Sequence, residues 1–346
     1  MEDLIIEKRG GIASCVLNRP QALNALTHEQ VLRLTQLLRT WEQDPAVAAV
    51  LIAGQGHKAF CAGGDIRALY HQILAGQMQA VADFFREEYR LNRLIHAFAK
   101  PYISLLDGIV MGGGAGLSIN GRYRIATERT LFAMPETAIG FYPDVGGTYF
   151  LSRLPGAVGI YLGLTGARLQ AADTYHIGLA THFVPGSDIA ALDTALSQQE
   201  TGAGIAAALA DFHRDPGPAP LQARRSLIDA IFGRPTLPAV LAALRAHEDP
   251  WVRQTLSVIE SHSPSALAVT FDALTRARSL SFDDCLKLEY RLSLQLALSH
   301  DFIEGVRAAI IDKSHAPRWS PPSVEAVPAR IYTLATIVPE GGDLSF

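Results

Sequence analysis

The first part of the chain alternates short apolar runs with amphipathic segments. Residues 4–7 and 12–17 are apolar runs on either side of a glycine pair, which predicts two strands joined by a turn. Thr27, with a glutamine three residues later, has the pattern of a capping box. Apolar positions then recur at helical spacing over 31–41, and 47–53 is typical of a buried strand. This order of elements predicts an α/β core.

A second round of the same pattern follows. We expect a helix over 84–98, a strand over 102–110, a strand over 123–127 and a helix over 156–164. Between the first two strands lies a glycine cluster, 112–116. The α/β character therefore continues to about residue 185.

The rest of the chain has a different composition. Residues 188–212 are rich in alanine with a helical pattern, and the proline-rich run 215–220 is typical of a linker. Further helices are predicted over 237–246, 251–261, 265–277 and 282–298, and the prolines of the tail exclude a long helix there. We expect a catalytic core over 1–187 and a helical C-terminal region with a proline-rich tail over 188–346.

Composition and charge narrow the class of protein. The 346 residues are 49% hydrophobic and 18% charged, which is enough apolar material for a large core and excludes intrinsic disorder. The net charge of −4 provides no basic field for nucleic acid or an anionic membrane. The longest apolar stretch, 103–119, contains Asp107 and several glycines, so we expect no membrane span.

The cysteines indicate a compartment. Cys15, Cys61 and Cys285 are far apart and odd in number, so they predict neither a disulfide framework nor a zinc site. The chain also opens with acidic residues, where a targeting peptide would be basic. We expect a protein of the reducing cytoplasm.

The glycine cluster over 112–116 does not match the common nucleotide or hydrolase motifs. Leu117 or Ile119 stands where a dinucleotide fingerprint needs its last glycine, and the chain has no phosphate-loop motif, no G-x-S-x-G and no H-E-x-x-H. A glycine-rich turn between strand and helix can offer backbone N–H groups to an oxygen that gains negative charge. Tight packing of a helix on a sheet explains the glycines equally well.

A second small-residue loop, Cys61-Ala62-Gly63-Gly64-Asp65, also follows a strand and precedes a helix. It could supply another backbone donor, with Asp65 as the helix cap. Taken alone, it is an ordinary turn.

Two carboxylates occur in the apolar run 131–148. Glu136 and Asp144 have aliphatic and aromatic neighbours between prolines and glycines. Desolvation raises the pKa of such groups and suits them to acid–base chemistry. Two exposed loop acids are the alternative.

Glu87 and Glu88 form another acidic pair, on the helix predicted over 84–98. Adjacent residues of a helix point about 100° apart, so at most one of the two faces the interior, and a solvated helix face is the default interpretation for both.

Together these segments resemble the enoyl-CoA hydratase/isomerase (crotonase) superfamily. The matching segments are 18–20 with 23–26, 61–65, 112–114 and 135–136, in order, across 12–185. Members that hydrolyse 3-hydroxyisobutyryl-CoA are matched further by 84–89, 134–147, 301–308 and 312–313. The resemblance implies a spiral of ββα units that forms two packed sheets, with a helical C-terminal region.

The resemblance also implies a site. The N–H groups of Gly64 and Gly113 would form an oxyanion hole for a thioester carbonyl, and Glu88 would line the acyl pocket. Hydratases of the superfamily carry a glutamate after the glycine cluster, where this chain has Gly116. The loss of that side chain disfavours hydration and favours hydrolysis of a short 3-hydroxyacyl-CoA, as in valine breakdown.

In the implied reaction, Glu136 activates water or attacks the carbonyl itself, and Asp144 assists proton transfer or holds the substrate's 3-hydroxyl. Arg19, Lys58 and Arg67 flank the loops and could pair with CoA phosphates, although ordinary surface charge explains them as well. We expect no metal or other cofactor, an acyl-CoA as the small-molecule partner, and a homo-oligomer.

Two alternatives remain open. One is a hydratase or isomerase acting on a short unsaturated acyl-CoA, against which Gly116 argues. The other is a CoA-binding scaffold without catalysis, against which the presence of both Glu136 and Asp144 argues.

Overall fold

The computed structural model describes residues 2–346, which divide into two compact units that interleave along the sequence. The first unit comprises the chain up to Gly64, Arg90–Ala133 and Arg168–Gln222. The second comprises Asp65–Tyr89, Met134–Ala167 and Ala223–Phe346. The domain boundary after residue 187 stays a prediction.

The larger sheet of the first unit has six strands in the order β1-β2-β3-β5-β7-β10. They are β1 (Leu4–Arg9), β2 (Ile12–Leu17), β3 (Ala49–Gly54), β5 (Tyr102–Leu106), β7 (Tyr123–Ala126) and β10 (His182–Phe183). The predicted hairpin is confirmed, because β1 and β2 pair antiparallel. The other neighbours in this sheet pair in parallel, as helical crossovers require.

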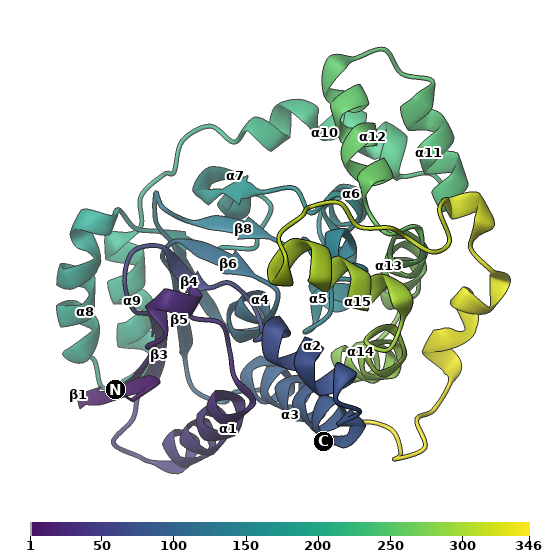
Figure 1. Cartoon of the computed structure of the whole chain (residues 1–346). Helices are drawn as coiled ribbons and strands as arrows, with labels where there is room; N and C mark the ends of the chain where they lie inside the picture. The colour runs from purple at the N-terminus through teal and green to yellow at the C-terminus, as the bar shows by residue number, and fades with distance from the viewer. Residues whose placement is uncertain (1) are drawn as a thin grey trace. The chain divides into compact units, whose positions relative to one another are not determined.

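The smaller sheet has four strands in the order β4-β6-β8-β9, of which β4, β6 and β8 are labelled in Figure 1. They are β4 (Ala59–Cys61), β6 (Ile109–Met111), β8 (Leu131–Ala133) and β9 (Leu169–Gln170). The consecutive strand pairs β3–β4, β5–β6 and β7–β8 each give their first strand to the larger sheet and their second to the smaller one. This regular division confirms the predicted spiral and its two sheets.

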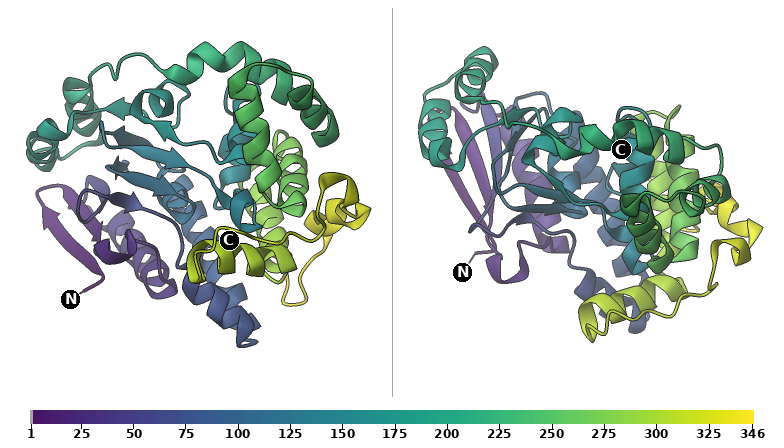
Figure 2. Two further views of the ribbon diagram at one scale, coloured as in Figure 1. Left: turned by 45° about the horizontal axis from the view of Figure 1, so that its top comes forward. Right: turned by 90° about the horizontal axis from the view of Figure 1, so that it is seen from above.

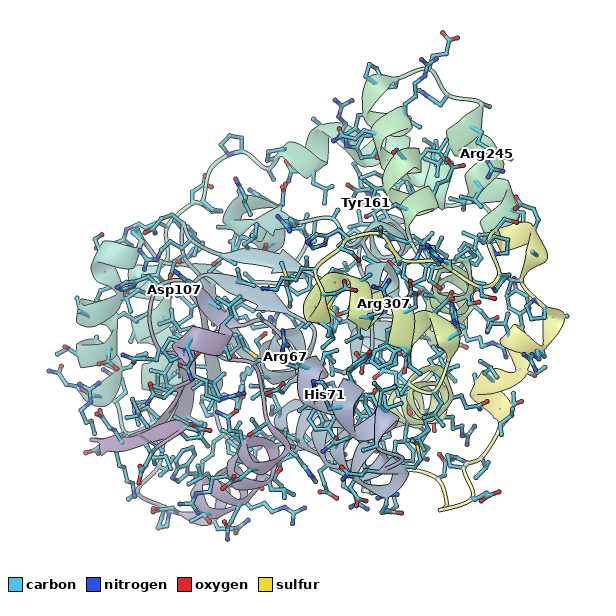
Figure 3. The ribbon with its side chains drawn as sticks, in the orientation of Figure 1. Arg67, His71, Asp107, Tyr161, Arg245 and Arg307 are labelled. Atoms are coloured by element: carbon cyan, nitrogen blue, oxygen red, sulfur yellow. The ribbon has the colours of Figure 1, made fainter. Side chains whose placement is uncertain are left out.

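The strand expected over 102–110 is two strands, which corrects the prediction. The chain turns at Asp107 and at Gly108, whose φ is +91°. Asp107, labelled in Figure 3, accepts hydrogen bonds from Thr127 at 2.6 Å and from Arg129 at 2.8 Å. An apolar run cannot reveal this break, because strands in both sheets are buried and equally hydrophobic.

The helices of the first unit cover its larger sheet. Helix α1 (His28–Gln43) begins in the expected capping box, with Thr27 accepting from the Gln30 backbone N–H. Leu196 of α8 (Ile189–Ser197) and Ile205 of α9 (Gly202–Phe212) join a buried cluster with strand residues such as Ile103. The remaining helices of this unit are α4 (Gly113–Ser118) and α7 (Ala171–His176).

The second unit is mainly helical. Its helices are α2 (Ile66–Leu74), α5 (Gly147–Ser152), α6 (Val158–Thr165), α11 (Leu237–Arg245), α12 (Pro250–Ser261), α13 (Pro264–Ala277), α14 (Phe282–Leu296) and α15 (His300–Val306). Helix α13 packs against α5 and α6 and buries residues around most of its circumference. The tail after residue 313, yellow in Figure 2, contains only short helical turns, as its prolines predict.

Each of two further helices contains residues of both units. They are α3 (Met78–His96) and α10 (Pro220–Phe232). Helix α3 begins six residues before the predicted start at 84. No helix among residues 2–346 combines the length and hydropathy needed to span a bilayer.

Candidate active site

The two glycine loops both belong to the first unit. Gly64 follows β4 and forms an isolated bridge with Leu26, whose N–H donates to the Gly63 carbonyl at 2.9 Å. Gly113 is the first residue of α4 and follows Gly112, whose φ of +49° and ψ of −122° open the turn. The N–H of a first helical residue has no acceptor within its own helix, so it can serve a ligand.

The loops approach each other closely. A Cβ atom at Gly114 would lie 2.1 Å from the Cys61 carbonyl oxygen, and one at Gly63 would lie 3.9 Å from the Gly113 nitrogen. Any side chain at position 114 would therefore push the loops apart. The interpretation of the glycines as a requirement of close packing is confirmed, and their role as backbone donors to a ligand oxygen stays a prediction.

The end of the second loop is a helix cap. Asp65 belongs to the second unit, and its side chain accepts from the Ala68 N–H at 3.2 Å at the start of α2. The predicted capping role of Asp65 is confirmed.

Glu136 is a buried carboxyl of the second unit. It opens a short 3₁₀ turn, Glu136–Ile139, and is 7% exposed. Its Oε2 atom has no hydrogen-bond partner within the described chain. Burial, with a contribution from the nearby Asp144 carboxylate, raises the pKa of Glu136 well above its usual value. The predicted desolvation of this group is therefore confirmed.

Asp144 is buried in the same unit but is tied to a neighbour. It is 6% exposed, and its Oδ2 accepts a hydrogen bond from the Tyr89 hydroxyl at 2.6 Å. Burial raises the pKa of Asp144 to about 7, although the Tyr89 hydrogen bond acts in the opposite direction. This pKa lies where a carboxyl can both give and take a proton near neutral pH.

Glu88 lies on α3 and is only 3% exposed. The expectation that Glu88 belongs to a solvated helix face is therefore wrong. Its neighbour Glu87 is partly exposed, which fits the expected angle between adjacent helical residues. Glu88 Oε1 has no hydrogen-bond partner among residues 2–346. Burial, and then the Asp144 charge, raise the pKa of Glu88 well above its usual value.

Aromatic rings pack beside Glu88, because Phe85 lies three residues before it on the buried face of α3. Phe85 of α3 stacks on Phe141 with ring centroids 5.9 Å apart, and Phe141 contacts Phe302 of α15 at 5.1 Å. All three rings are buried. Apolar rings provide no hydrogen bonds to a carboxylate, so they favour its protonated form.

The structure adds a residue that the sequence analysis missed, Glu289 of α14. It is fully buried and accepts from the Gly146 N–H at 2.7 Å, the Thr148 N–H at 3.0 Å and the Thr148 hydroxyl at 2.6 Å. These bonds hold the turn that carries Asp144, in which Val145 has a φ of +55°. A β-branched residue in this region is strained and needs such support.

A signal for Glu289 was present in the sequence. It lies in the apolar stripe of α14, between buried Leu286 and Leu292 at helical spacing. Burial raises the pKa of Glu289 to about 8, against the effect of its Thr148 hydrogen bonds.

The three basic residues expected near CoA lie in different settings. Arg19 donates to the Ala25 carbonyl at 2.6 Å, and Lys58 is exposed beside a 250 Å³ depression lined in part by Pro20. In the second unit, Arg67 of α2, labelled in Figure 3, donates to the Ile310 carbonyl at 2.7 Å. A CoA-binding role for these residues stays a prediction. Within residues 2–346 no cluster of potential metal ligands was found.

Comparison with known proteins agrees with the two-sheet fold. A model of the family described as "Enoyl-CoA hydratase/isomerase" matches residues 12–333. The chain belongs to this family.

Curated relatives in the enoyl-CoA hydratase/isomerase family cover nearly the whole chain. A human protein named 3-hydroxyisobutyryl-CoA hydrolase, mitochondrial, is 42% identical over 94% of this chain and 86% of its own length. A protein of Arabidopsis thaliana named probable 3-hydroxyisobutyryl-CoA hydrolase 3 is 41% identical over 93% of this chain and 88% of its own.

Solved structures of the family have the same fold but other names. A carnitinyl-CoA dehydratase from Mycobacterium thermoresistibile is 40% identical, with a TM-score of 0.93 over 99% of this chain and 98% of its own. An enoyl-CoA hydratase from Rhodobacter sphaeroides is 40% identical, with a TM-score of 0.92 over all of both chains. The names of the relatives therefore include both thioester hydrolysis and addition or removal of water.

Proposed function

We propose that the protein hydrolyses the thioester of a short 3-hydroxyacyl-CoA, with 3-hydroxyisobutyryl-CoA as its principal substrate. Relatives that carry this name share 40–43% identity over more than nine-tenths of the chain. The observation that favours hydrolysis over hydration is the pair of buried carboxyls, Glu136 and Asp144, in a chain that has Gly116 where the hydratases carry their other glutamate.

In this mechanism, the N–H groups of Gly64 and Gly113 bind the carbonyl oxygen of the thioester. Each such donor typically contributes about 3 kcal/mol in the transition state. Water then adds to the carbonyl carbon while Glu136 takes its proton, the C–S bond breaks, and CoA leaves as a thiolate that is reprotonated. Alternatively, a Glu136 oxygen attacks the carbonyl carbon first, the C–S bond breaks to release the CoA thiolate, and water hydrolyses the resulting mixed anhydride to free the acid and Glu136.

Both routes need Glu136 in its ionised form. Because burial raises the pKa of Glu136, we expect turnover to increase with pH beyond the range of an ordinary carboxyl. Asp144 assists proton transfer or accepts the substrate's 3-hydroxyl, and Glu88 lines the acyl pocket. A thiolate is a good leaving group, so the reaction requires no metal or redox cofactor.

The second candidate is reversible hydration of an unsaturated acyl-CoA. It is supported by the names of the two solved structures that are 40% identical. The third candidate is a CoA-binding scaffold without catalysis, in which the buried carboxyls would have no function.

One experiment separates these three. The purified protein is given 3-hydroxyisobutyryl-CoA and, separately, crotonyl-CoA, while free thiol and the absorbance of the enoyl thioester are followed together. Hydrolysis predicts thiol release from the first substrate without formation of an enoyl thioester. Loss or gain of enoyl absorbance without thiol indicates a hydratase, and binding without either change indicates a scaffold.

The compartment and the assembly stay predictions. All three cysteines are free and buried, which supports the proposed reducing compartment. The human relative is named mitochondrial, so the cytoplasm is one of two locations to test by fractionation. For the proposed homo-oligomer, light scattering of the purified protein gives the number of copies.

A further inference from the structure

Three buried hydroxyl groups connect Asp144 to helix α14. The Tyr89 hydroxyl lies 2.6 Å from Asp144 Oδ2 and 2.6 Å from Ser293 Oγ. Ser293 Oγ lies 2.8 Å from the Tyr142 hydroxyl, which in turn lies 2.6 Å from the Glu289 carbonyl oxygen. These atoms form one continuous chain of short hydrogen bonds, which we call the hydroxyl chain.

The hydroxyl chain is sealed from solvent. Tyr89, Tyr142 and Ser293 are each 0% exposed, and all lie in the second unit with Asp144. A buried hydroxyl without a partner is costly, so each of these oxygens depends on its neighbours in the chain. When Asp144 gains or loses a proton, the hydrogen bonds within the hydroxyl chain must therefore rearrange.

Counting protons shows how the hydroxyl chain can do this. With Asp144 ionised, Tyr89 donates to Asp144, Ser293 donates to Tyr89, and Tyr142 donates to the Glu289 carbonyl, so the Ser293–Tyr142 contact holds no proton. With Asp144 protonated on Oδ2, Asp144 donates to Tyr89, Tyr89 to Ser293, Ser293 to Tyr142, and Tyr142 still to the Glu289 carbonyl. Tyr89 and Ser293 therefore reverse the direction in which they donate, and each hydroxyl has a partner in both states.

We propose that Tyr89, Ser293 and Tyr142 are positioning residues, and that the Tyr89 and Ser293 hydroxyls reverse the direction in which they donate as Asp144 gains or loses a proton. The chain keeps Asp144 hydrogen-bonded to Tyr89 in both states. It also occupies Oδ2, so Oδ1 is the oxygen left for the reacting groups. The catalytic part of this inference rests on the proposed function.

Several other ionisable groups act on the same environment. Burial first, and then the Asp144 charge, raise the pKa of Glu88 and of Glu136. Burial also raises the pKa of Glu289 of α14, with a smaller contribution from the Asp144 charge. The phenols of Tyr89 and Tyr142 are also raised in pKa, first by burial and then by Asp144. The two phenols therefore remain protonated donors across the working range of pH.

The ionised form of Asp144 gains most from the chain, because a hydrogen bond to a charged acceptor is stronger than one between neutral groups. Removing the Tyr89 hydroxyl should therefore raise the pKa of Asp144. Removing the Ser293 hydroxyl should raise it less, because Tyr89 still donates but is no longer polarised by a donor of its own.

The first test uses the unliganded protein and does not depend on turnover. The side-chain carboxyl carbons of aspartate are labelled with ¹³C, and the Asp144 signal is assigned by its loss in Asp144→Asn. We expect the midpoint of its titration to move up by roughly one pH unit in Tyr89→Phe and by less in Ser293→Ala. The phenylalanine keeps the ring that packs on Phe85, so folding should survive.

Tyr290→Phe is the matched control. Tyr290 also lies on α14 and is buried, but its hydroxyl accepts from Arg86 rather than joining the hydroxyl chain. Its Asp144 titration should equal that of the wild type. Unchanged midpoints in both Tyr89→Phe and Ser293→Ala, with native unfolding curves, would overturn the proposal, and so would an equal shift in Tyr290→Phe.

The second test is the pH profile of thiol release. We expect Tyr89→Phe to lower kcat about tenfold with little change in KM, and to move the midpoint of the kcat profile in step with the Asp144 titration. A profile that does not follow that titration contradicts the catalytic part of the proposal. If the wild type releases no thiol, the proposed function fails, while the NMR titration still decides whether the hydroxyl chain governs Asp144.

Discussion

The glycine loops of the first unit and the carboxyls of the second are specified in opposite ways. The loops depend on side chains that are absent: a Cβ atom at Gly114 would lie 2.1 Å from the Cys61 carbonyl oxygen. The carboxyls are side chains that are present but poorly solvated, with Glu136 Oε2 and Glu88 Oε1 unpaired within the described chain. In the proposed mechanism, backbone geometry prepares the chemistry in one region and desolvation prepares it in the other.

The difference teaches where each region is sensitive. At Gly114, any added atom would push the loops apart, whereas the chemical nature of that atom matters little. Around the carboxyls, shape can stay constant while one charge or one hydroxyl decides the outcome. Isosteric substitutions should therefore be severe in the carboxyl cluster, and steric or backbone substitutions should be severe in the loops.

The largest effect is expected for the isosteric change Glu136→Gln. An amide can neither take a proton from water nor attack the thioester, so thiol release should fall about a hundredfold to ten-thousandfold. CoA binding, measured by calorimetry, should stay close to that of the wild type. Glu87→Gln, on the partly exposed neighbour of Glu88, is the control and should keep full activity. Full activity in Glu136→Gln would remove this residue from the chemistry.

The backbone counterpart is Gly113→Pro. Proline lacks the N–H and is tolerated at the first position of a helix, which Gly113 occupies. We expect kcat to fall about a hundredfold to a thousandfold, the usual cost of one oxyanion donor. Gly113→Ala retains the N–H and should lose clearly less. Equal losses in the two variants would mean that space, and not the amide, matters at this position.

A smaller and more selective effect is expected for Asp144→Asn. Turnover should fall about tenfold to a hundredfold, and the loss should be larger for 3-hydroxyisobutyryl-CoA than for an acyl-CoA without the hydroxyl. The comparison is made as kcat/KM on both substrates with one protein preparation. If the two substrates lose activity equally, Asp144 does not hold the hydroxyl.

The smallest effect on turnover is expected for Glu289→Gln, which acts on the turn. The pKa of Glu289 is raised from 4.5 to about 8 in the folded protein, so its contribution to stability is fully present below pH 4.5 and is lost as pH rises through about 8. Glutamine does not titrate, so the free energy of unfolding of the variant should vary less with pH over this window. Urea titrations at several pH values measure this, and parallel curves for both proteins would contradict it.

Much of the fold could be predicted from the sequence. The hairpin, the capped helix α1 and the helices after residue 237 follow from local periodicity and capping residues, and they are confirmed. The break of the strand at Asp107–Gly108 could not be found in this way. It depends on the chain passing between two sheets that are equally apolar.

The burial of the site carboxyls could be predicted from the sequence, but the bonds that hold them could not. The apolar neighbours of Glu136 and Asp144 predicted their burial, because those neighbours are adjacent in sequence. The bonds of Tyr89 and Glu289 to the Asp144 turn join residues 55 and more than 140 positions apart. The sequence indicates such long-range pairs only indirectly, for example by a glutamate within the apolar stripe of a helix.

In the proposed mechanism, the glycine amides and Glu136 act on one thioester. The most direct measurement is the infrared carbonyl stretch of ¹³C-labelled 3-hydroxyisobutyryl-CoA bound to Glu136→Gln, which binds the substrate but should not cleave it. Hydrogen bonds from two backbone amides should move this stretch to lower frequency than in water, and adding Gly113→Pro should reverse part of the shift. A bound carbonyl that absorbs as it does in water would contradict the account.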